Sequence, residues 1–375
     1  MKINRYNYSV PIVFIALITI FMGFDLGKTV YAAPAVDVPC TGVQEEVAFA
    51  GVGSGWKLCV STIDKFGLII TNAYFKTSPS SPYIKVLGDG RIGEIFVVYH
   101  TGTPRFKDIA EFNFSKSPMS VGDCPEPHVI LGVLKRICRE HHDSGVAWRN
   151  DDKVRRGQEV LYWGSLDAAN YNYVMEWKFR DDGAISVRAG STGPKLGSEP
   201  NTGHAHNFTW RLDFDLNGPG NDSVFINKHL EDIDLPISTA QDTIQRIDTE
   251  SGLIWHAREF NTLEIRDSTL KNGNGRPTGY QLLPLRSGTS RHSEAVTRKD
   301  FWVTRFSAGE LLAFTLPTYL NSESTVDQDI VVWYTASAHH ENNMRDEDKD
   351  TVPVIWVGFL LEPQNLFSRT PFYVP

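Results

Sequence analysis

Two histidines separated by a single residue, His204 and His206, begin an apolar run that ends in two aspartates, HAHNFTWRLDFD at residues 204–215. Alternate side chains of a β-strand share a face, so both imidazoles should lie on the face that carries the aromatic residues of the run. Asp213 and Asp215 should then occupy the opposite, wetter face. Imidazole groups suit copper or zinc, whereas carboxylates suit calcium or manganese. The run therefore predicts two chemically different metal sites on one strand.

A second segment repeats this association of carboxylate and imidazole at the two ends of an apolar strand. It begins with Asp329, continues as IVVWY, and is followed by His339 and His340. A lone His-X-His pair often arises by chance, and it is the second segment that favours metal binding. Because Asp329 and His340 are an odd number of residues apart, a continuous strand would place them on opposite faces. We therefore expect His340 to join the first two histidines, with His339 as the alternative ligand, and Asp329 to join the aspartates.

Composition limits the classes of function. The 375 residues are 41% apolar and 11% aromatic, which is enough for a sizeable core in one large β domain or two ordinary ones. The formal net charge is −8, and basic residues are scattered along the chain. Nucleic acid is therefore not an expected partner.

The N-terminus is typical of a secretory signal. Lys2 and Arg5 precede an apolar stretch from Val10 to Phe24, and Ala32 and Ala33 follow as small residues at a cleavage site. The stretch is short for a membrane span, so an uncleaved anchor is the alternative. After cleavage we expect a secreted protein without membrane contact. The chain is accordingly divided into a signal peptide at 1–32, an N-terminal segment at 33–54 and one large domain at 55–375.

Four cysteines also suit an oxidising compartment. They are Cys40, Cys59, Cys124 and Cys138. Nearness in sequence favours the pairs Cys40–Cys59 and Cys124–Cys138, although the two other connectivities remain open. His141 and His142, just after the last cysteine, are expected in a polar loop, with metal binding as the alternative.

Three Asn-X-Ser/Thr sequons beyond the expected signal segment predict a glycoprotein. They begin at Asn113, Asn207 and Asn221. Asn207 lies inside the histidine strand and should stay unmodified. Asn221 follows a Gly-Pro-Gly sequence and should be more accessible.

The pattern of the remaining chain favours a mainly β fold. Short alternating runs separated by turn residues dominate after the signal segment. In the clearest hairpin, at residues 171–190, the two strands are joined at Asp182-Gly183. Tyr171 and Tyr173 share the parity of the apolar residues in the first strand, so both should point inward.

Several separated motifs follow one another in an order that is typical of one enzyme family. Asn170-Tyr171-Asn172 precedes the hairpin, and His204-X-His206 follows it, with Asp-X-Asp seven residues beyond. Asp329 and His340 are eleven residues apart, and the chain closes with VGFLLEPQNLFSRTPFYV at 357–374. GDCPEP at 122–127 and RICREHHDSGVAW at 136–148 lie upstream. Over roughly residues 55–375, these motifs resemble the catalytic domain of the copper-containing amine oxidases, the topaquinone enzymes.

The resemblance implies a fold and a set of site residues. The fold would be a large antiparallel β-sandwich, without the small N-terminal domains that are common in the family. Copper would be bound by His204, His206 and His340, and topaquinone would be formed from Tyr171, next to Asn170. A second metal, calcium or manganese, would be bound by Asp213, Asp215 and Asp329 with the carbonyls of Phe214 and Ile330. The catalytic base would be Asp108, in the segment DIAEFN, and Cys124–Cys138 would be the family's disulfide pair.

The resemblance also implies an activity. A secreted homodimer would use copper and topaquinone to oxidise a primary amine to an aldehyde, with O2 as the oxidant and with release of ammonia and hydrogen peroxide. Two departures bear on the quinone: Asn172 replaces an acid after the cofactor tyrosine, and Ser144 stands in the place of a tyrosine that contacts the quinone oxygen. The alternatives are the same scaffold turned to another reaction in specialised-metabolite biosynthesis, and a non-catalytic metal-binding protein.

Overall fold

The computed structural model describes most of the chain after the expected signal segment. The described residues are 39–114, 117–168, 171–193, 202–230, 241–256, 261–285, 292–341 and 352–373. The signal peptide expected at 1–32 and Asn170 lie outside them. Among the described residues, no helix has the length and apolar character needed to cross a membrane.

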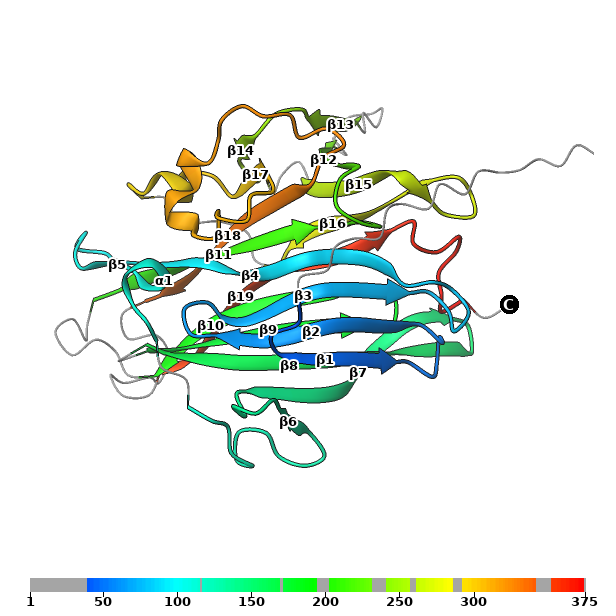
Figure 1. Cartoon of the computed structure of the whole chain (residues 1–375), viewed down its shortest axis with the longest axis horizontal. Helices are drawn as coiled ribbons and strands as arrows, with labels where there is room; N and C mark the ends of the chain where they lie inside the picture. Colours follow the sequence, from blue (N-terminus) through cyan, green and yellow to red (C-terminus); the bar gives the residue numbers. More distant parts are fainter. Residues whose placement is uncertain are drawn as a thin grey trace, which may run out of the picture. The chain divides into compact units, whose positions relative to one another are not determined.

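The strands of the described residues form two antiparallel sheets (Figure 1). The first sheet has the order β1-β2-β3-β4-β11-β18-β17-β14, with β5 paired to β4. Its strands are β1 (Val43–Ala48), β2 (Gly55–Ile63), β3 (Gly67–Lys76), β4 (Ile84–Tyr99), β5 (Arg105–Lys107), β11 (His204–Phe214), β14 (Ser251–Leu253), β17 (Phe301–Arg305) and β18 (Ile330–His340). Because β1 pairs with β2, residues 43–48 belong to the same sheet as the chain from residue 55 onward.

The second sheet has the order β13-β12-β15-β16-β19-β10-β9-β8-β7-β6. Its strands are β6 (Val129–Leu131), β7 (Ile137–Asn150), β8 (Lys153–Ala168), β9 (Tyr171–Arg180), β10 (Ile185–Gly193), β12 (Asp222–Leu230), β13 (Gln241–Ile247), β15 (Thr262–Lys271), β16 (Pro277–Pro284) and β19 (Val352–Gln364). Within the described ranges, three short helical segments lie between strands: α1 (Asp108–Glu111), η2 (Ala295–Arg298) and η3 (Ala313–Thr318).

The two sheets pack face to face around one apolar core that takes residues from both. The approach is close: a Cβ atom on Gly90 of β4 would lie 2.5 Å from the ring of Trp177 in β9. Aromatic rings fill much of the interface, and Trp210 of β11 contacts Phe359 of β19 at 5.3 Å between ring centroids. The expected large antiparallel β-sandwich is confirmed.

The predicted hairpin is present. β9 pairs with β10 in the register Phe179 to Ile185, and Gly183 adopts a φ of 88° in the turn between them. A positive φ strains any side chain with a Cβ, which explains the glycine at this position. Tyr171 and Tyr173 point inward and are buried, as their parity predicts.

The expectation of a wetter face on the histidine strand is wrong. Every residue of β11 is buried, and Asp213 and Asp215 are only 5% and 6% exposed. β11 is an inner strand, paired with β4 on one side and β18 on the other. Its outer face is covered by the chain around η3, where Arg211 donates to the carbonyl of Glu310 at 2.9 Å. The histidines and aspartates of this segment therefore lie in dry surroundings.

Both favoured disulfides are present, Cys40–Cys59 and Cys124–Cys138. The sequons differ in accessibility. The Asn207 side chain is fully buried and donates to the carbonyl of Phe96 at 3.2 Å, which fits the expectation that it stays unmodified. Asn113 and Asn221 are exposed.

Candidate metal centre and active site

The three expected imidazoles meet at one end of β11. His204 and His340 are directly opposite each other in the antiparallel pairing of β11 with β18, and His206 follows on the same face of β11. His204 Nε2 lies 3.3 Å from His340 Nδ1, and one ring nitrogen of each histidine lies within 4.8 Å of the other two. All three side chains are almost completely buried. The fold thus brings His204 and His340, 136 positions apart in sequence, into one cluster.

One ring nitrogen of each histidine faces the cluster and can act as a metal ligand. His204 Nδ1 donates to the carbonyl of Thr202 at 3.2 Å, which leaves the lone pair of Nε2 directed at the cluster. His206 Nε2 is buried and has no hydrogen-bond partner within the described part of the chain. Burial, together with the neighbouring His204 and His340, holds the pKa of His206 well below its ordinary value, so its imidazole is neutral. Three buried imidazoles, one of them with an orphaned nitrogen, fit copper.

Tyr171, at the start of β9, reaches across from the second sheet to this cluster. Its hydroxyl lies 3.0 Å from His204 Nε2 and 3.0 Å from His340 Nδ1. A hydroxyl can donate one hydrogen bond and accept another, so it can satisfy both nitrogens when no metal is bound. The phenol oxygen therefore occupies a position next to the metal that these nitrogens would bind.

Of the two departures from the family pattern, Asn172 directly follows Tyr171, whereas Ser144 lies far from it. Asn172 is exposed on the outer face of β9. Ser144 is far along β7: its neighbour Gly145 pairs with Gly157 of β8, whereas Tyr171 pairs with Ala168. Eleven residues of strand separate those two β8 positions, roughly 35 Å. Ser144 therefore cannot take the place of a tyrosine that contacts the quinone, because the strand register carries it away from Tyr171.

Asp108 begins the short helix α1 and points into the sandwich. Its side chain is 7% exposed and accepts a short hydrogen bond from the hydroxyl of Tyr173. Burial raises the pKa of Asp108 to about 7, and the Tyr173 hydrogen bond acts in the opposite direction. The same Tyr173 oxygen lies 3.5 Å from His206 Nδ1. Tyr173 therefore links the Asp108 carboxyl group to His206 of the histidine cluster.

A second buried carboxyl group, that of Glu94, binds the backbone at the start of α1. Glu94 of β4 accepts hydrogen bonds from the backbone N–H groups of Ile95 at 2.9 Å and Ile109 at 2.8 Å. Burial raises the pKa of Glu94 to about 7, and the nearby Asp108 acts in the same direction. Since Ile109 follows Asp108 directly, this contact fixes the helix start that carries the candidate base.

Asp108 and Tyr171 share a small cavity of about 80 Å³. Its walls are mainly aromatic and apolar: Val97, Tyr99, Phe106, Phe112, Phe114, Ala168 and Tyr173 complete the lining. Tyr99 also stacks on His204, with ring centroids 4.5 Å apart. The cavity therefore brings a titratable carboxyl group, a phenol and the edge of the metal cluster together in apolar surroundings, as active sites commonly do.

The three expected aspartates gather at the opposite end of β11. One oxygen atom from each of Asp213, Asp215 and Asp329 lies within 4.8 Å of the other two. Phe214 and Ile330, whose carbonyls are the other candidate ligands, are paired across β11 and β18. Burial and the other two carboxylates raise the pKa of Asp213 well above its ordinary value, and burial raises that of Asp329 to about 6. Such mutual repulsion favours a bound cation.

A protein cation already lies at this carboxylate cluster. Lys85 of β4 is 5% exposed, and its Nζ lies 2.9 Å from Asp215 Oδ2. Arg211 Nη1 lies 4.0 Å from Asp213 Oδ2. A calcium or manganese ion would therefore share Asp215 with Lys85. No pattern around residues 84–99 distinguishes Lys85 from an ordinary surface lysine of a strand, and the sequence analysis missed it.

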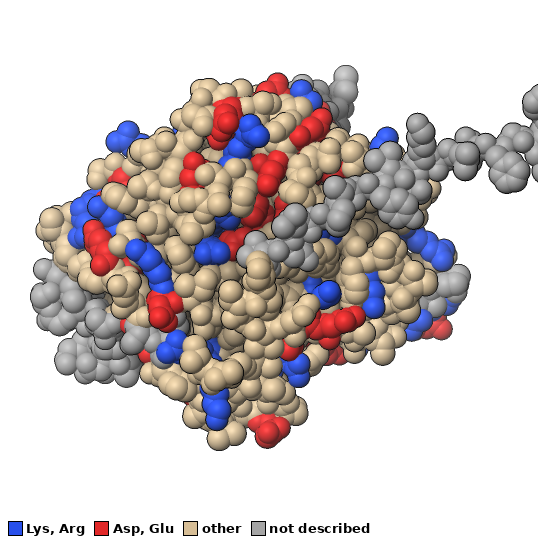
Figure 2. All heavy atoms as spheres, viewed as in Figure 1, with Lys and Arg blue, Asp and Glu red and all other residues tan. Residues whose placement is uncertain are grey.

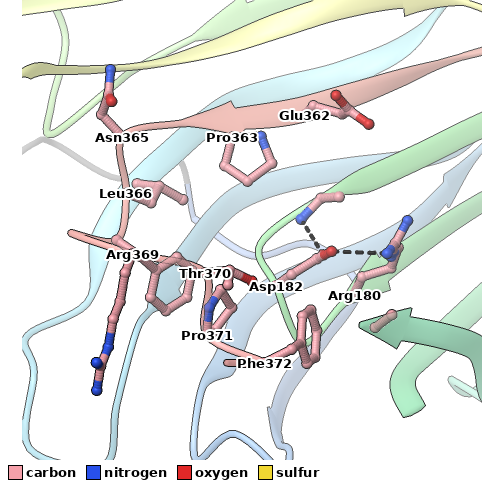
Figure 3. Close-up of a pocket in the computed structure, with 13 residues that line it drawn as sticks. Arg180, Asp182, Glu362, Pro363, Asn365, Leu366, Arg369, Thr370, Pro371 and Phe372 are labelled. Atoms are coloured by element: carbon pink, nitrogen blue, oxygen red, sulfur yellow. Dashed lines mark hydrogen bonds and ion pairs between the residues drawn. The ribbon is translucent and has the colours of Figure 1, made fainter. Parts of the chain in front are cut away.

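A larger cavity of about 330 Å³ lies elsewhere (Figure 3). It is formed between the β9–β10 hairpin and the chain after β19, and Arg180 and Asp182 form an ion pair at 2.8 Å in its wall. Neither the three histidines nor Asp108 line it. Size alone therefore does not identify the reactive pocket in this protein.

Tyr173 and Glu94 were also missed as site residues. The parity of β9 turns Tyr173 toward the same interior as Tyr171, which is a usable signal, but its contact with Asp108 joins two sheets. Glu94 carries no sequence signal, because a single glutamate in an apolar run is most often exposed.

The chain is similar in sequence to copper amine oxidases. The enzyme-domain model of the copper amine oxidases matches residues 201–374. Curated relatives include the copper-containing amine oxidase gamma 2 of Arabidopsis thaliana, 24% identical over 410 residues, covering 88% of this chain and 59% of the relative. Copper amine oxidase 1 of Aspergillus niger is 27% identical over 356 residues, which cover 75% of this chain and 52% of the relative.

Solved structures share the fold. A copper-containing benzylamine oxidase from Hansenula polymorpha superposes with a TM-score of 0.72 at 16% identity, covering 92% of this chain and 64% of that one. Pichia pastoris lysyl oxidase gives 0.69 at 17% identity, covering 99% and 57%. This chain thus spans little more than half the length of the curated relatives named above. The family model over residues 201–374, the curated relatives and the shared fold all support a copper amine oxidase catalytic domain in this chain.

Proposed function

We propose that this protein is a secreted oxidase that uses copper and a topaquinone made from Tyr171 to convert a primary amine to an aldehyde. Ammonia and hydrogen peroxide are the other products, and O2 is the oxidant. The observation that carries the proposal is the position of the Tyr171 hydroxyl, 3.0 Å from His204 Nε2 and 3.0 Å from His340 Nδ1. A metal bound by the three buried imidazoles would lie next to this phenol and could act on it.

Each residue of the site has its own role in the proposed reaction. His204, His206 and His340 hold copper, and copper and the quinone supply the carbonyl electrophile and the redox chemistry. Asp108 accepts a proton from the substrate carbon next to nitrogen. Its pKa of about 7 lets it take and return a proton at physiological pH. Tyr173 holds the Asp108 carboxylate in place, and the aromatic walls of the cavity exclude water and favour an amine with an apolar substituent.

The carboxylate cluster is proposed as a structural cation site. Asp213, Asp215 and Asp329, with the carbonyls of Phe214 and Ile330, would bind calcium or manganese.

Secretion is supported by the two disulfides, which are typical of oxidising compartments. On the face seen in Figure 2, acidic and basic side chains are interspersed.

Copper binding is tested with His204→Ala. The wild-type protein should bind about one copper ion per chain, and the variant should lose it, because removal of a direct ligand costs more than the roughly 10–100-fold in affinity lost with an outer partner. His339→Ala is the matched control, since His339 is exposed and contacts His100 instead. Metal analysis and electron paramagnetic resonance give the readout. Full copper occupancy in His204→Ala would rule out this ligand set.

The quinone is tested with Tyr171→Phe, which removes the phenol oxygen and little volume. Wild-type protein loaded with copper in air should show quinone absorbance, react with phenylhydrazine and produce peroxide, and the variant should lose all three while keeping its copper. Peptide mass spectrometry identifies the modified residue. An unmodified Tyr171 peptide in copper-loaded wild-type protein would overturn the oxidase proposal.

The base is tested with Asp108→Asn, which should keep the quinone colour and lose about 10²- to 10⁴-fold in turnover. Glu111→Gln, on the exposed side of the same helix, should leave turnover unchanged. Because the base acts when ionised, kcat/KM of the wild-type protein should rise with pH through about 7. Tyr173→Phe removes a hydrogen bond that lowers the Asp108 pKa, so it should move this limb to higher pH. A limb that stays in place in Tyr173→Phe would contradict the assignment.

We also propose a homodimer, because the family resemblance implies one. Light scattering should give about twice the mass of one chain over a wide range of concentration. A single-chain mass throughout that range would contradict this.

A further inference from the structure

We propose that His128, Glu140 and His142 form a second transition-metal site, which binds zinc on the second sheet and is separate from the three-histidine cluster. One donor atom from each of the three residues lies within 4.8 Å of the others. Glu140 Oε2 lies 2.7 Å from His142 Nε2 and 3.9 Å from His128 Nε2. Two imidazoles and one carboxylate are a donor set that zinc uses in proteins, with a fourth position left for water.

Strand geometry brings these three residues together. Glu140 and His142 are two residues apart in β7, so they share a face. β6 pairs with β7 in the register Val129 to Arg139, and one further step of that register places His128 opposite Glu140. The expectation that His142 lies in a polar loop is therefore wrong, because the strand continues through it. Strand β7 sets the positions of Glu140 and His142, and His128 ends the turn at residues 125–128 directly before β6.

Two neighbouring features hold the donors in place. Trp163 of β8 donates from Nε1 to Glu140 Oε1 at 2.8 Å, which fixes the carboxylate and leaves Oε2 for the imidazoles. Metal-binding carboxylates are commonly oriented in this way by an outer partner. The disulfide Cys124–Cys138 ties the chain before His128 to β7, two residues before Glu140. Both contacts position the ligands before any ion arrives.

The site is accessible and distinct from the proposed copper site. The side chains of His128, Glu140 and His142 are 23%, 17% and 35% exposed, so an ion from solvent can reach them and keep a water ligand. Glu140 pairs with Leu161 of β8, seven residues before Ala168, which pairs with Tyr171. That distance along the strand is roughly 23 Å. Zinc at this site would connect the chain around β6 to β7.

The test uses copper-loaded wild-type protein, in which copper already fills the three-histidine cluster. Titration with zinc, followed by metal analysis and calorimetry, should give one further zinc ion per chain. His142→Ala should weaken that binding more than about tenfold. His141→Ala is the matched control, because His141 is exposed and alternates to the other face of β7, and it should bind zinc as the wild-type protein does.

A second variant distinguishes loss of the zinc site from misfolding. Glu140→Gln keeps the size of the side chain and an acceptor for Trp163, and it should also lose the zinc while keeping copper and its melting temperature without zinc. Zinc should raise the melting temperature of wild-type protein and His141→Ala only. Unchanged zinc affinity in both Glu140→Gln and His142→Ala would overturn the proposal, as would the absence of a further zinc ion in wild-type protein. Neither outcome depends on amine oxidation.

Discussion

The antiparallel pairing of β11 with β18 is the constraint on which the proposed chemistry depends. One register places His204 opposite His340 and, ten residues further along β11, Phe214 opposite Ile330. The imidazole cluster and the carboxylate cluster are therefore the two ends of the same strand pair. Pairing with β4 on the other side adds Lys85 near the aspartates and Glu94 near the candidate base. Backbone pairing thus sets the positions of the three histidines, and Asp215 and Asp329 directly adjoin the same two strands.

Removal from water sets the protonation of the site residues. Burial is the largest influence on three groups near the cavity, and it moves each toward its neutral form: the pKa of His206 falls, and those of Asp108 and Glu94 rise to about 7. The neutral imidazole can bind a metal, and the carboxyl groups can exchange protons near neutral pH. A single cause, the dry interior between two sheets, therefore prepares a metal ligand and a base.

The alternation of side chains along strands predicted much of this structure. It failed where a side chain is buried by, or contacts, a segment that is distant in sequence. The inward faces of Tyr171 and Tyr173, the hairpin turn at Gly183 and the meeting of His204, His206 and His340 follow from a two-residue period. The wetter face expected for the aspartates was wrong, because parity cannot show that the chain around η3 covers it. The family pattern misplaced Ser144, since it aligned positions without the strand register. Contacts between the sheets, such as Tyr173 with Asp108, have no signal in local sequence.

The burial of β11 on both faces restricts how this segment can change during evolution. Faces alternate strictly along a strand, so the insertion or deletion of one residue would turn every later side chain to the other side. In the middle of β11, such a change would direct aspartates toward the apolar core and aromatic rings toward Lys85 and Arg211. Homologous chains can therefore vary this strand by substitution, but a shift in its length by one residue would dismantle one cluster or the other. The length of β11 is therefore more restricted than the identity of any single side chain between its two ends.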